Sequence, residues 1–417
     1  VFSNSMMEIA RRGIFHPEMF MFQEVMMIYL AVIVTDIILL DVFNTLGLPT
    51  STTVSMVFEL LGASVAMSIF KIIGGEDVPS FLTFMGDLPT LGDYINYDKA
   101  MRMITGIFAV VLVAFIAGVI IQWLVRFLLT FNYAHRLKYL GGLIGGVALT
   151  GIVFYLLLKG VKGTTIISPG SKEWIETHSM LLMAICFVGF TLISQLLVSV
   201  FKINILKVIV LSGTFALAMA FAGNDLVNFI GVPLAALGAF GFYRQTGDID
   251  MYMGGLNTDV KTPVFILAAA GIIMMLALIF SKKAHNVLKT TVDLSRSEGA
   301  DERFRPNTIS KLMVRASVYL GRGLSYLLPR RISEHIEGRF DRPYVKDIKQ
   351  RDVPAFDLVR ASVNVVVPAI IIAMGTNSTL PLSTTYTTFM VAMGSSLADR
   401  AWGLESAVSV SYTHLTL

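Results

Sequence analysis

Two short runs rich in hydroxyl side chains recur far apart in this chain of 417 residues. The first is Leu-Pro-Thr-Ser-Thr-Thr at 48–53, and the second is Leu-Pro-Leu-Ser-Thr-Thr at 380–385. An Asn and a Gly shortly precede each run, and an apolar stretch containing Gly follows it. Proline ends a helix because it lacks a backbone N–H, and Ser or Thr favours the start of the next helix. Each run therefore predicts a helix broken at membrane depth.

The start of a helix can hold an anion, because its first N–H groups have no partner within the helix and its dipole is positive there. Two such ends facing each other could surround a tetrahedral oxyanion without a buried arginine. The alternative is that the hydroxyls only bond to carbonyls of their own helix, as is common in membrane helices. Paired motifs in two halves of a hydrophobic chain favour the anion site. Its candidate residues are Ser51, Thr52, Thr53, Ser383, Thr384 and Thr385.

A carboxylate stands at the junction of two other apolar blocks. Asp225 follows Asn224 and precedes Asn228 within a Gly-containing segment. An ionisable group among apolar residues is costly and usually functional. Carboxylate, amide and backbone oxygens suit a small hard cation such as Na⁺, and a carboxylate alone could bind a proton instead. The alternative is that Asp225 caps a helix at the membrane interface.

Glu59 is a further candidate, since it follows Ser51 by two helical turns and lies on roughly the same face. It could be a second ligand for a cation or proton, or it could pair with a lysine elsewhere. Glu24 and Asp36 are weaker candidates. The histidines form no metal-ligand spacing, and no phosphate-binding Gly-Lys-Ser/Thr loop occurs, so nothing indicates ATP-driven transport.

Composition places these residues in a membrane. Hydrophobic residues make up 55% of the chain and charged residues 15%, with a mean hydropathy of +0.71. The runs 104–129 and 140–158 are as long as the roughly 18–20 apolar residues that cross a bilayer. The net charge of +4 gives no reason to expect nucleic acid as a partner, and the single Cys186 excludes an intrachain disulfide or a cysteine metal cluster.

The sequence therefore predicts an all-α polytopic membrane protein. Two shorter apolar blocks, 225–241 and 383–398, are interrupted by Gly and Pro and are interpreted as re-entrant or broken helices. The full spans are expected at 20–46, 51–73, 103–130, 140–158, 180–200, 205–222, 263–280 and 357–375.

Loop charges predict the orientation. Lys and Arg cluster at 135–138, at Lys202 and Lys207 and over 281–350, whereas acidic residues dominate 74–98 and 247–259. The spans alternate consistently if the basic loops face the cytoplasm. The basic face of the long loop is expected to meet anionic lipid headgroups rather than a specific partner.

The combined motifs resemble those of a known family. The segment 222–236 resembles the Gly-Ala-Asn-Asp-x-x-Asn signature of the inorganic phosphate transporter (PiT) family, the sodium/phosphate symporters, and 49–53 and 381–385 resemble its Pro-Val-Ser-Thr-Thr motif. The resemblance covers nearly the whole chain. It implies two inverted repeats with broken helices around a central site, where the six hydroxyl residues hold phosphate and Asp225 with Asn224 holds the coupling cation.

Two departures from the family pattern stand out. No residue matches the family's first Asn-Asp motif, since Asp36 and Asp41 lie in the wrong context, and we infer that this motif lies upstream of Val1 and that the chain is N-terminally truncated. The family often has His after Ser-Thr-Thr, where Val54 and Tyr386 stand here. That difference puts a proton role for this position in doubt.

The chain is expected to divide into four parts. Residues 1–160 form a first membrane repeat, incomplete at its N-terminus, and 161–280 contain connecting spans and the start of a second repeat with its acidic hairpin. Segment 281–356 is a cytoplasmic basic insertion. Residues 357–417 complete the second repeat, and their end is interpreted as truncated or foreign sequence.

The expected function is symport of inorganic phosphate with Na⁺ or H⁺ by alternating access across a cell membrane, which is interpreted as a bacterial inner membrane. The alternatives are transport of another tetrahedral oxyanion such as sulfate, or a non-transporting membrane receptor or scaffold. An enzyme acting on a lipid phosphate would need a nucleophile or acid–base pair, and the sequence offers none. No cofactor is expected beyond the coupling ion, and a homodimer is left open.

Overall fold

The computed structural model describes residues 4–74, 90–154, 169–258, 264–293, 357–377 and 382–399, with a few single residues between 319 and 340. The regular secondary structure of the described chain is helical, apart from two isolated backbone bridges that join Phe15 to Ile95 and Met21 to Tyr252. The first elements are α1 (Asn4–Arg12), η1 (Pro17–Met19), α2 (Phe22–Leu46), α3 (Thr52–Gly74), α5 (Leu91–Tyr94), α6 (Tyr97–Leu129), α7 (Ala134–Val153), α8 (Pro169–Thr177) and α9 (Ser179–Ser199). They are followed by α10 (Ile205–Thr246), η4 (Met253–Asn257), α11 (Val264–Phe280), α12 (Lys282–Asp293), α15 (Leu358–Asn377) and α16 (Thr384–Ala398).

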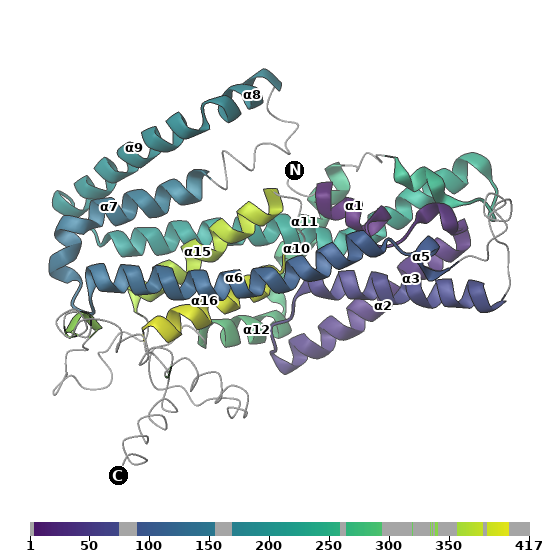
Figure 1. The fold of residues 1–417 in the computed structure, drawn as a ribbon, viewed down its shortest axis with the longest axis horizontal. Coiled ribbons are helices and arrows are strands. Elements are labelled where there is room, and N and C mark those ends of the chain that lie inside the picture. The colour runs from purple at the N-terminus through teal and green to yellow at the C-terminus, as the bar shows by residue number, and fades with distance from the viewer. Residues whose placement is uncertain are drawn as a thin grey trace, which may run out of the picture.

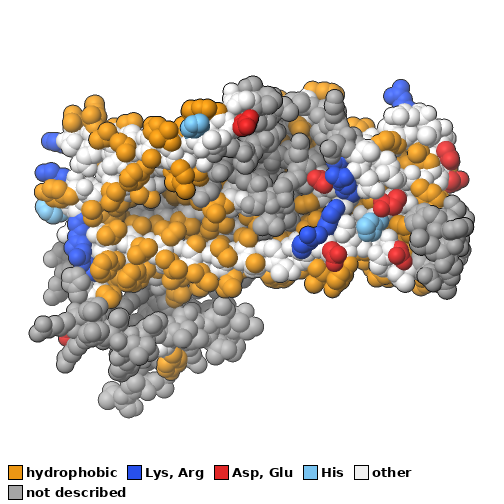
Figure 2. Space-filling view, turned by 45° about the horizontal axis from the view of Figure 1, so that its top comes forward, with side chains coloured by type: hydrophobic (Ala, Val, Ile, Leu, Met, Phe, Trp, Pro, Cys, Tyr) orange, Lys and Arg blue, Asp and Glu red, His pale blue; other side chains and the backbone are white. Residues whose placement is uncertain are grey.

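Seven helices in the described part are long and apolar enough to cross a bilayer, namely α2, α3, α6, α7, α9, α10 and α15. Their outer faces carry large apolar side chains, which form the orange surface of Figure 2. An apolar surface of this extent suits lipid rather than water. The expectation of an all-α polytopic membrane fold is confirmed.

The helix α10 is the longest element and runs unbroken for 42 residues. The expected separation into a span at 205–222 and a re-entrant block at 225–241 is therefore wrong. The polar residues near Asp225 do not end the helix, because they bond to hydroxyl groups of neighbouring helices. Pro233 lies inside the helix, as membrane helices tolerate when neighbours satisfy the freed backbone groups.

The helices α2 and α3 form an antiparallel pair, which we call the first hairpin. The helix α2 ends at Leu46, and Gly47 follows it with φ 68°, a left-handed conformation that glycine adopts without strain. The helix α3 starts again at Thr52. At the far end of the pair Lys71 of α3 lies 2.8 Å from Glu24 of α2.

The helices α15 and α16 form a second antiparallel pair, which we call the second hairpin. The Ser395 hydroxyl of α16 lies 2.6 Å from Oδ1 of Asn364 of α15, and an added Cβ on Gly375 would overlap Leu382 near the turn. Pro381 of the second Ser-Thr-Thr run lies outside the described residues. Figure 1 shows the first hairpin toward the right of the molecule and the second toward the left, with the start of α3 and the start of α16 near the centre.

Charged side chains are unevenly distributed along the molecule. Figure 2 shows Lys and Arg at its left end, whereas toward its right end most of the Asp and Glu lie together with further Lys and Arg. The orientation relative to the cytoplasm remains a prediction. The predicted insertion 281–356 is described mainly for α12, and most of it, like 400–417, lies outside the described residues. The four-part division therefore also remains a prediction.

The helices α6 and α16 run side by side with their backbones in close approach. A Cβ added to Gly394 would lie 2.3 Å from the carbonyl oxygen of Phe115, and one added to Gly118 would lie 2.5 Å from that of Val391. Both neighbours are backbone atoms, which cannot turn aside as a side chain could. The second hairpin is therefore held against α6 along the length of α16.

We expect Gly394→Ala to destabilise the protein by about 1–3 kcal/mol, because the helices must move apart. The matched control is Gly189→Ala in α9, where an added Cβ meets no atom within 4 Å and alanine favours the helix. Thermal unfolding in detergent measures the stability of both variants. Equal melting temperatures for the two variants would contradict the close approach.

Candidate functional site

Three helices meet at the carboxylate of Asp225, about half-way along α10. The hydroxyls of Thr52 and Thr384 donate hydrogen bonds to Oδ1 of Asp225 at 3.2 and 2.9 Å. The Asn224 amide lies 3.4 Å from the same oxygen. The first residues of α3 and of α16 therefore contact one carboxyl group, although they are more than 300 residues apart in the sequence.

The two hairpin turns also contact each other. The Thr53 hydroxyl donates to the carbonyl oxygen of Leu382 at 3.1 Å, and Asn224 donates to that same oxygen at 3.2 Å and to the Thr53 hydroxyl at 3.0 Å. Asn228 donates to Thr52 at 3.0 Å and to Thr53 at 2.7 Å. The Thr53 side chain is fully buried. Asn224 and Asn228 lie one turn apart on α10, so they present their amides from the same face.

Each Ser-Thr-Thr run begins its helix as the residue types predict. The Ser51 hydroxyl accepts from the backbone N–H of Val54 at 3.2 Å, and the Ser383 hydroxyl accepts from that of Tyr386 at 3.0 Å. Thr385 follows in the first turn of α16 and is half-buried. The two helix starts converge on Asp225, and their dipoles place two positive ends beside it.

The oxygen atoms around Asp225 could hold a hard cation. In the described part of the chain, Oδ1 of Asn228 is buried without a hydrogen-bond partner, and an enclosed acceptor of this kind suits a cation ligand. No group of three or more His, Cys, Asp or Glu among the described residues could hold a metal ion. A cation at this place would therefore depend on Asp225 together with amide and hydroxyl oxygens.

A pocket of about 550 Å³ opens beside the turn of the first hairpin. Its polar wall contains Thr50, Ser51, Ser55 and Glu59 of the first hairpin, and Tyr386 of the second hairpin also borders it. Both Ser-Thr-Thr runs thus contribute to the pocket or lie next to it, and a small ion in the pocket would be close to the start of α3.

A comparison with known protein families identifies the family of this chain. The family model described as the phosphate transporter family matches residues 1–297. The chain belongs to the phosphate transporter family. It is therefore a multi-pass membrane transporter and not an enzyme, and the resemblance of its motifs to those of the phosphate transporters is confirmed.

A solved structure named "The sodium-dependent phosphate transporter" is similar to this phosphate transporter family member. The TM-score is 0.57 at 14% sequence identity, and the match covers 95% of this chain and 76% of that one. At this identity the likeness shows a shared fold. No curated protein matches the chain.

The structure of this family member brings most of the predicted site residues together. Thr52, Thr53, Thr384, Asn224 and Asn228 lie around Asp225, while the two serines cap the helices. Their roles toward phosphate and a cation remain predictions. Glu59 does not reach this group. Its Oε1 accepts from the Ser55 hydroxyl at 2.6 Å.

Asp36 is the residue that the sequence analysis undervalued. Its Oδ1 lies 3.3 Å from the same Ser55 hydroxyl that contacts Glu59, so two carboxyl groups share one hydroxyl beside the pocket. The spacing gave only an approximate signal. Asp36 lies ten residues before the end of α2 at Leu46 and Glu59 seven residues after the start of α3 at Thr52, so the two positions agree to within about one helical turn.

Thr53→Val removes a buried hydroxyl at the contact between the two turns while keeping the side-chain shape. We expect a loss of unfolding free energy of about 1–3 kcal/mol, because buried polar partners on α10 and at Leu382 lose their hydrogen bonds. Thr53→Ser should recover most of the loss. Thr105→Val is the control, since that threonine is exposed and its hydroxyl bonds to a carbonyl of its own helix. A thermal midpoint for Thr53→Val equal to that of the control would refute the contact.

Proposed function

We propose that this chain carries inorganic phosphate across the membrane in symport with a cation. The observation that supports this function best is the convergence of two hydroxyl-rich helix starts on Asp225. The helix starts offer N–H and O–H donors to an oxyanion, and Asp225 with Asn224 and Asn228 offers oxygens to a cation. Membership of the phosphate transporter family agrees with the proposal, as does the sodium dependence of the transporter whose solved structure is similar.

Electrostatics favours coupling between the two ions. An anion 4 Å from an ionised Asp225 meets a repulsion of about 4 kcal/mol per unit of its charge, at an effective dielectric constant of about 20. A hydrogen bond to a charged group contributes about 1.5–3 kcal/mol, so one donor alone does not offset this repulsion. A cation on Asp225 removes it. Phosphate and cation therefore bind together far better than phosphate binds alone.

A cation bound at Asp225 would also change the hydrogen bonds of the site. Each threonine hydroxyl has one proton, and the structure directs those of Thr52 and Thr384 to Asp225. A cation that takes the electron pairs of Asp225 frees these two protons for another acceptor. Cation binding then prepares two donors for phosphate at the same time as it neutralises the carboxylate.

Transport follows from alternating access, in which the two hairpins belong to inverted repeats that expose the site to either side in turn. The two hairpins lie toward opposite ends of the molecule (Figure 1), and the first residue of α3 and that of α16 both contact Asp225, which supports this mechanism. The protein works in a cell membrane, the inner membrane if the chain is bacterial, and pairing of two copies is compatible with the proposal.

Transport of another tetrahedral oxyanion, such as sulfate, is the second candidate, because hydroxyl and amide donors serve all such ions. Phosphate changes its protonation near neutral pH and sulfate does not. The pH dependence of uptake, measured with each anion as competitor, therefore separates the two. A receptor or scaffold would accumulate neither anion.

Uptake of radiolabelled phosphate by the protein in liposomes tests the site. We expect Asp225→Asn to abolish cation-dependent uptake, and Thr384→Ala to weaken half-saturation by phosphate or cation about 10–100-fold through the loss of one charged hydrogen bond. Thr388→Ala is the control, since that hydroxyl bonds to the carbonyl of Thr384 one turn earlier. Normal uptake by both site variants would remove Asp225 and Thr384 from the proposed site.

Glu59 and Asp36 add a cation position to the proposal. The single proton of Ser55 cannot serve both carboxylates, so a stable pair needs an additional proton or cation, and Oε2 of Glu59 is enclosed without a partner in the described part of the chain. We expect Glu59→Gln to lower the number of cations transported per phosphate. The reversal potential of the phosphate-dependent current measures that number, and Glu18→Gln at the acidic end of the molecule is the control. An unchanged reversal potential would exclude Glu59 as a coupling ligand.

A further inference from the structure

A buried ion pair joins the two helices of the first hairpin at its base, by which we mean the end of the helix pair opposite the turn. The Lys71 ammonium lies 2.8 Å from Glu24 and 3.3 Å from the carbonyl oxygen of Met19, and the Lys71 side chain is 1% exposed. The rings of Phe20, Tyr94 and Tyr252 stand 5.6–6.0 Å from the ammonium nitrogen. Aromatic faces attract a cation at this distance. Lysine at this place is thus held from several sides.

The Glu24 carboxylate has a second partner, since it accepts from the backbone N–H of Met21 at 2.7 Å. Burial, with the nearby charges of Glu24 and Asp93, raises the pKa of the Tyr94 hydroxyl. The tyrosine ring therefore stays neutral, and the ion pair at this base is that of Lys71 with Glu24.

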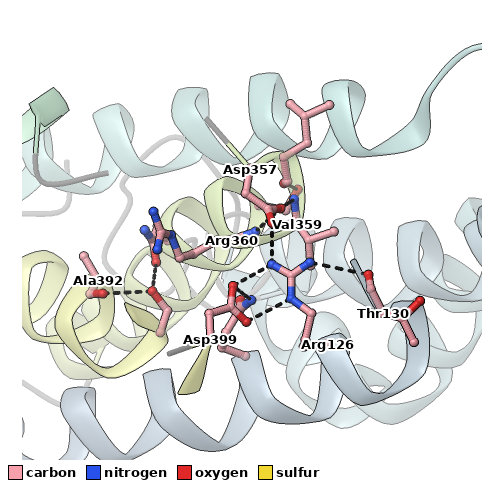
Figure 3. Close-up of polar contacts among 12 residues, drawn as sticks. Arg126, Thr130, Asp357, Val359, Arg360, Ala392 and Asp399 are labelled. Carbon is pink, nitrogen blue, oxygen red and sulfur yellow. Dashed lines mark hydrogen bonds and ion pairs between the residues drawn. The ribbon is translucent and has the colours of Figure 1, made fainter. Parts of the chain in front are cut away.

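The second hairpin is closed at its base by three charged groups. Arg126 of α6 lies between Asp357, at the start of α15, and Asp399, at the end of α16 (Figure 3). Its guanidinium donates to both oxygens of Asp399 at 2.9 and 2.5 Å and to Asp357 at 2.6 Å. Gln122 adds a bond to Asp399 at 2.8 Å. The Arg126 side chain is fully buried.

Charged groups join the two helices at the base of each hairpin, but the arrangement of the charges differs between the two hairpins. In the first hairpin the two helices carry opposite charges, so they bind each other directly. In the second hairpin a carboxylate stands at the end of each helix, Asp357 before α15 and Asp399 after α16. Arg126 binds both from a third helix, because its planar fork can serve two carboxylates at once.

Both bases lie far from the site. Along α3, Lys71 lies about 28 Å beyond Thr52, and along α16, Asp399 lies about 22 Å beyond Thr384, at about 1.5 Å per residue. Apolar contacts between antiparallel helices allow several registers, because one apolar side chain can replace another. A buried charge pair allows one register, since a slip leaves an uncompensated charge.

We propose that the two base clusters, Lys71–Glu24 and Asp357–Arg126–Asp399, are positioning residues that set the register of each hairpin and thereby place both Ser-Thr-Thr helix starts at Asp225. The role in transport rests on the proposed function. The register itself does not, so it can be measured separately. A displacement of about 1 Å at such a site can reduce function about 100-fold.

The test uses variants in which every charged member of a cluster is replaced by a neutral side chain. These are Lys71→Met with Glu24→Gln for the first base, and Arg126→Met with Asp357→Asn and Asp399→Asn for the second. Such neutral replacements often keep a protein folded. The control is Lys283→Met with Asp41→Asn, which removes an exposed ion pair.

The first readout is the distance between spin labels on the two hairpins of the full chain. Labels at Leu46→Cys of α2 and Met393→Cys of α16, both exposed positions, are introduced in a Cys186→Ser background. We expect the neutral variants to shift or broaden the distance distribution by up to about 5 Å, one helical turn, and the control to leave it unchanged. A folded base variant with the wild-type distribution would overturn the proposal, whether or not the protein transports phosphate.

The second readout is uptake in liposomes. We expect the neutral variants to raise the KM for phosphate about 10–100-fold with a melting temperature near that of the control, whereas a merely structural role would lower stability without changing KM. If a neutral variant does not fold, Arg126→Lys takes its place, because one ammonium cannot bridge both aspartates, and the same distance shift is expected. An unchanged KM and label distance in Arg126→Lys would overturn the role of Arg126. Absence of uptake by the wild type would refute the proposed function and leave the distance test intact.

Discussion

The site depends on a carboxylate held among the positive ends of two helices. Asp225 receives hydroxyl bonds from both hairpins, so in the proposed mechanism the donors for phosphate are occupied by an internal anion. An incoming anion must compete for these donors and also meets the charge of Asp225. A cation removes both obstacles at once. Coupling between the two ions, as proposed, then needs no long pathway, because the two ligands share one set of hydroxyl protons.

The continuity of α10 follows from the same arrangement. A broken helix at Asp225 would release backbone groups that need partners at membrane depth. Here α10 is continuous past Asp225, so it presents side chains at this place. One continuous helix therefore provides a common reference for both turns, and the amides of Asn224 and Asn228 bond the turn of the first hairpin to it from a single face.

The sequence could predict the features that depend on local chemistry. Apolar run lengths predicted six of the seven membrane-length helices of the described chain and the first half of the seventh, α10, whereas the expected span 263–280 corresponds to the shorter α11. Pro with Ser-Thr-Thr predicted where α3 and α16 begin. The doubling of that motif correctly suggested that two helix starts have related positions. The polar segment at Asp225 was misinterpreted as a break, because a sequence does not show that its amides find partners on other helices. Asp36 was undervalued for a similar reason, since its importance comes from the residue across the hairpin.

The charged groups at the hairpin bases show why contacts between distant parts of the sequence are hard to predict. Arg126 and Asp399 are separated by most of the chain, and each alone resembles an ordinary charge near the end of an apolar helix. Their structural role becomes visible only when the fold brings the two side chains together in an ion pair. A membrane helix pair has little hydrophobic driving force to select its register, so the selection falls to the few polar contacts along it. Each hairpin is a pair of packed helices, and in our proposal the charges at its base admit one register. That register places the helix start at the other end of the hairpin next to Asp225. Charges far from Asp225 can therefore determine the geometry around it.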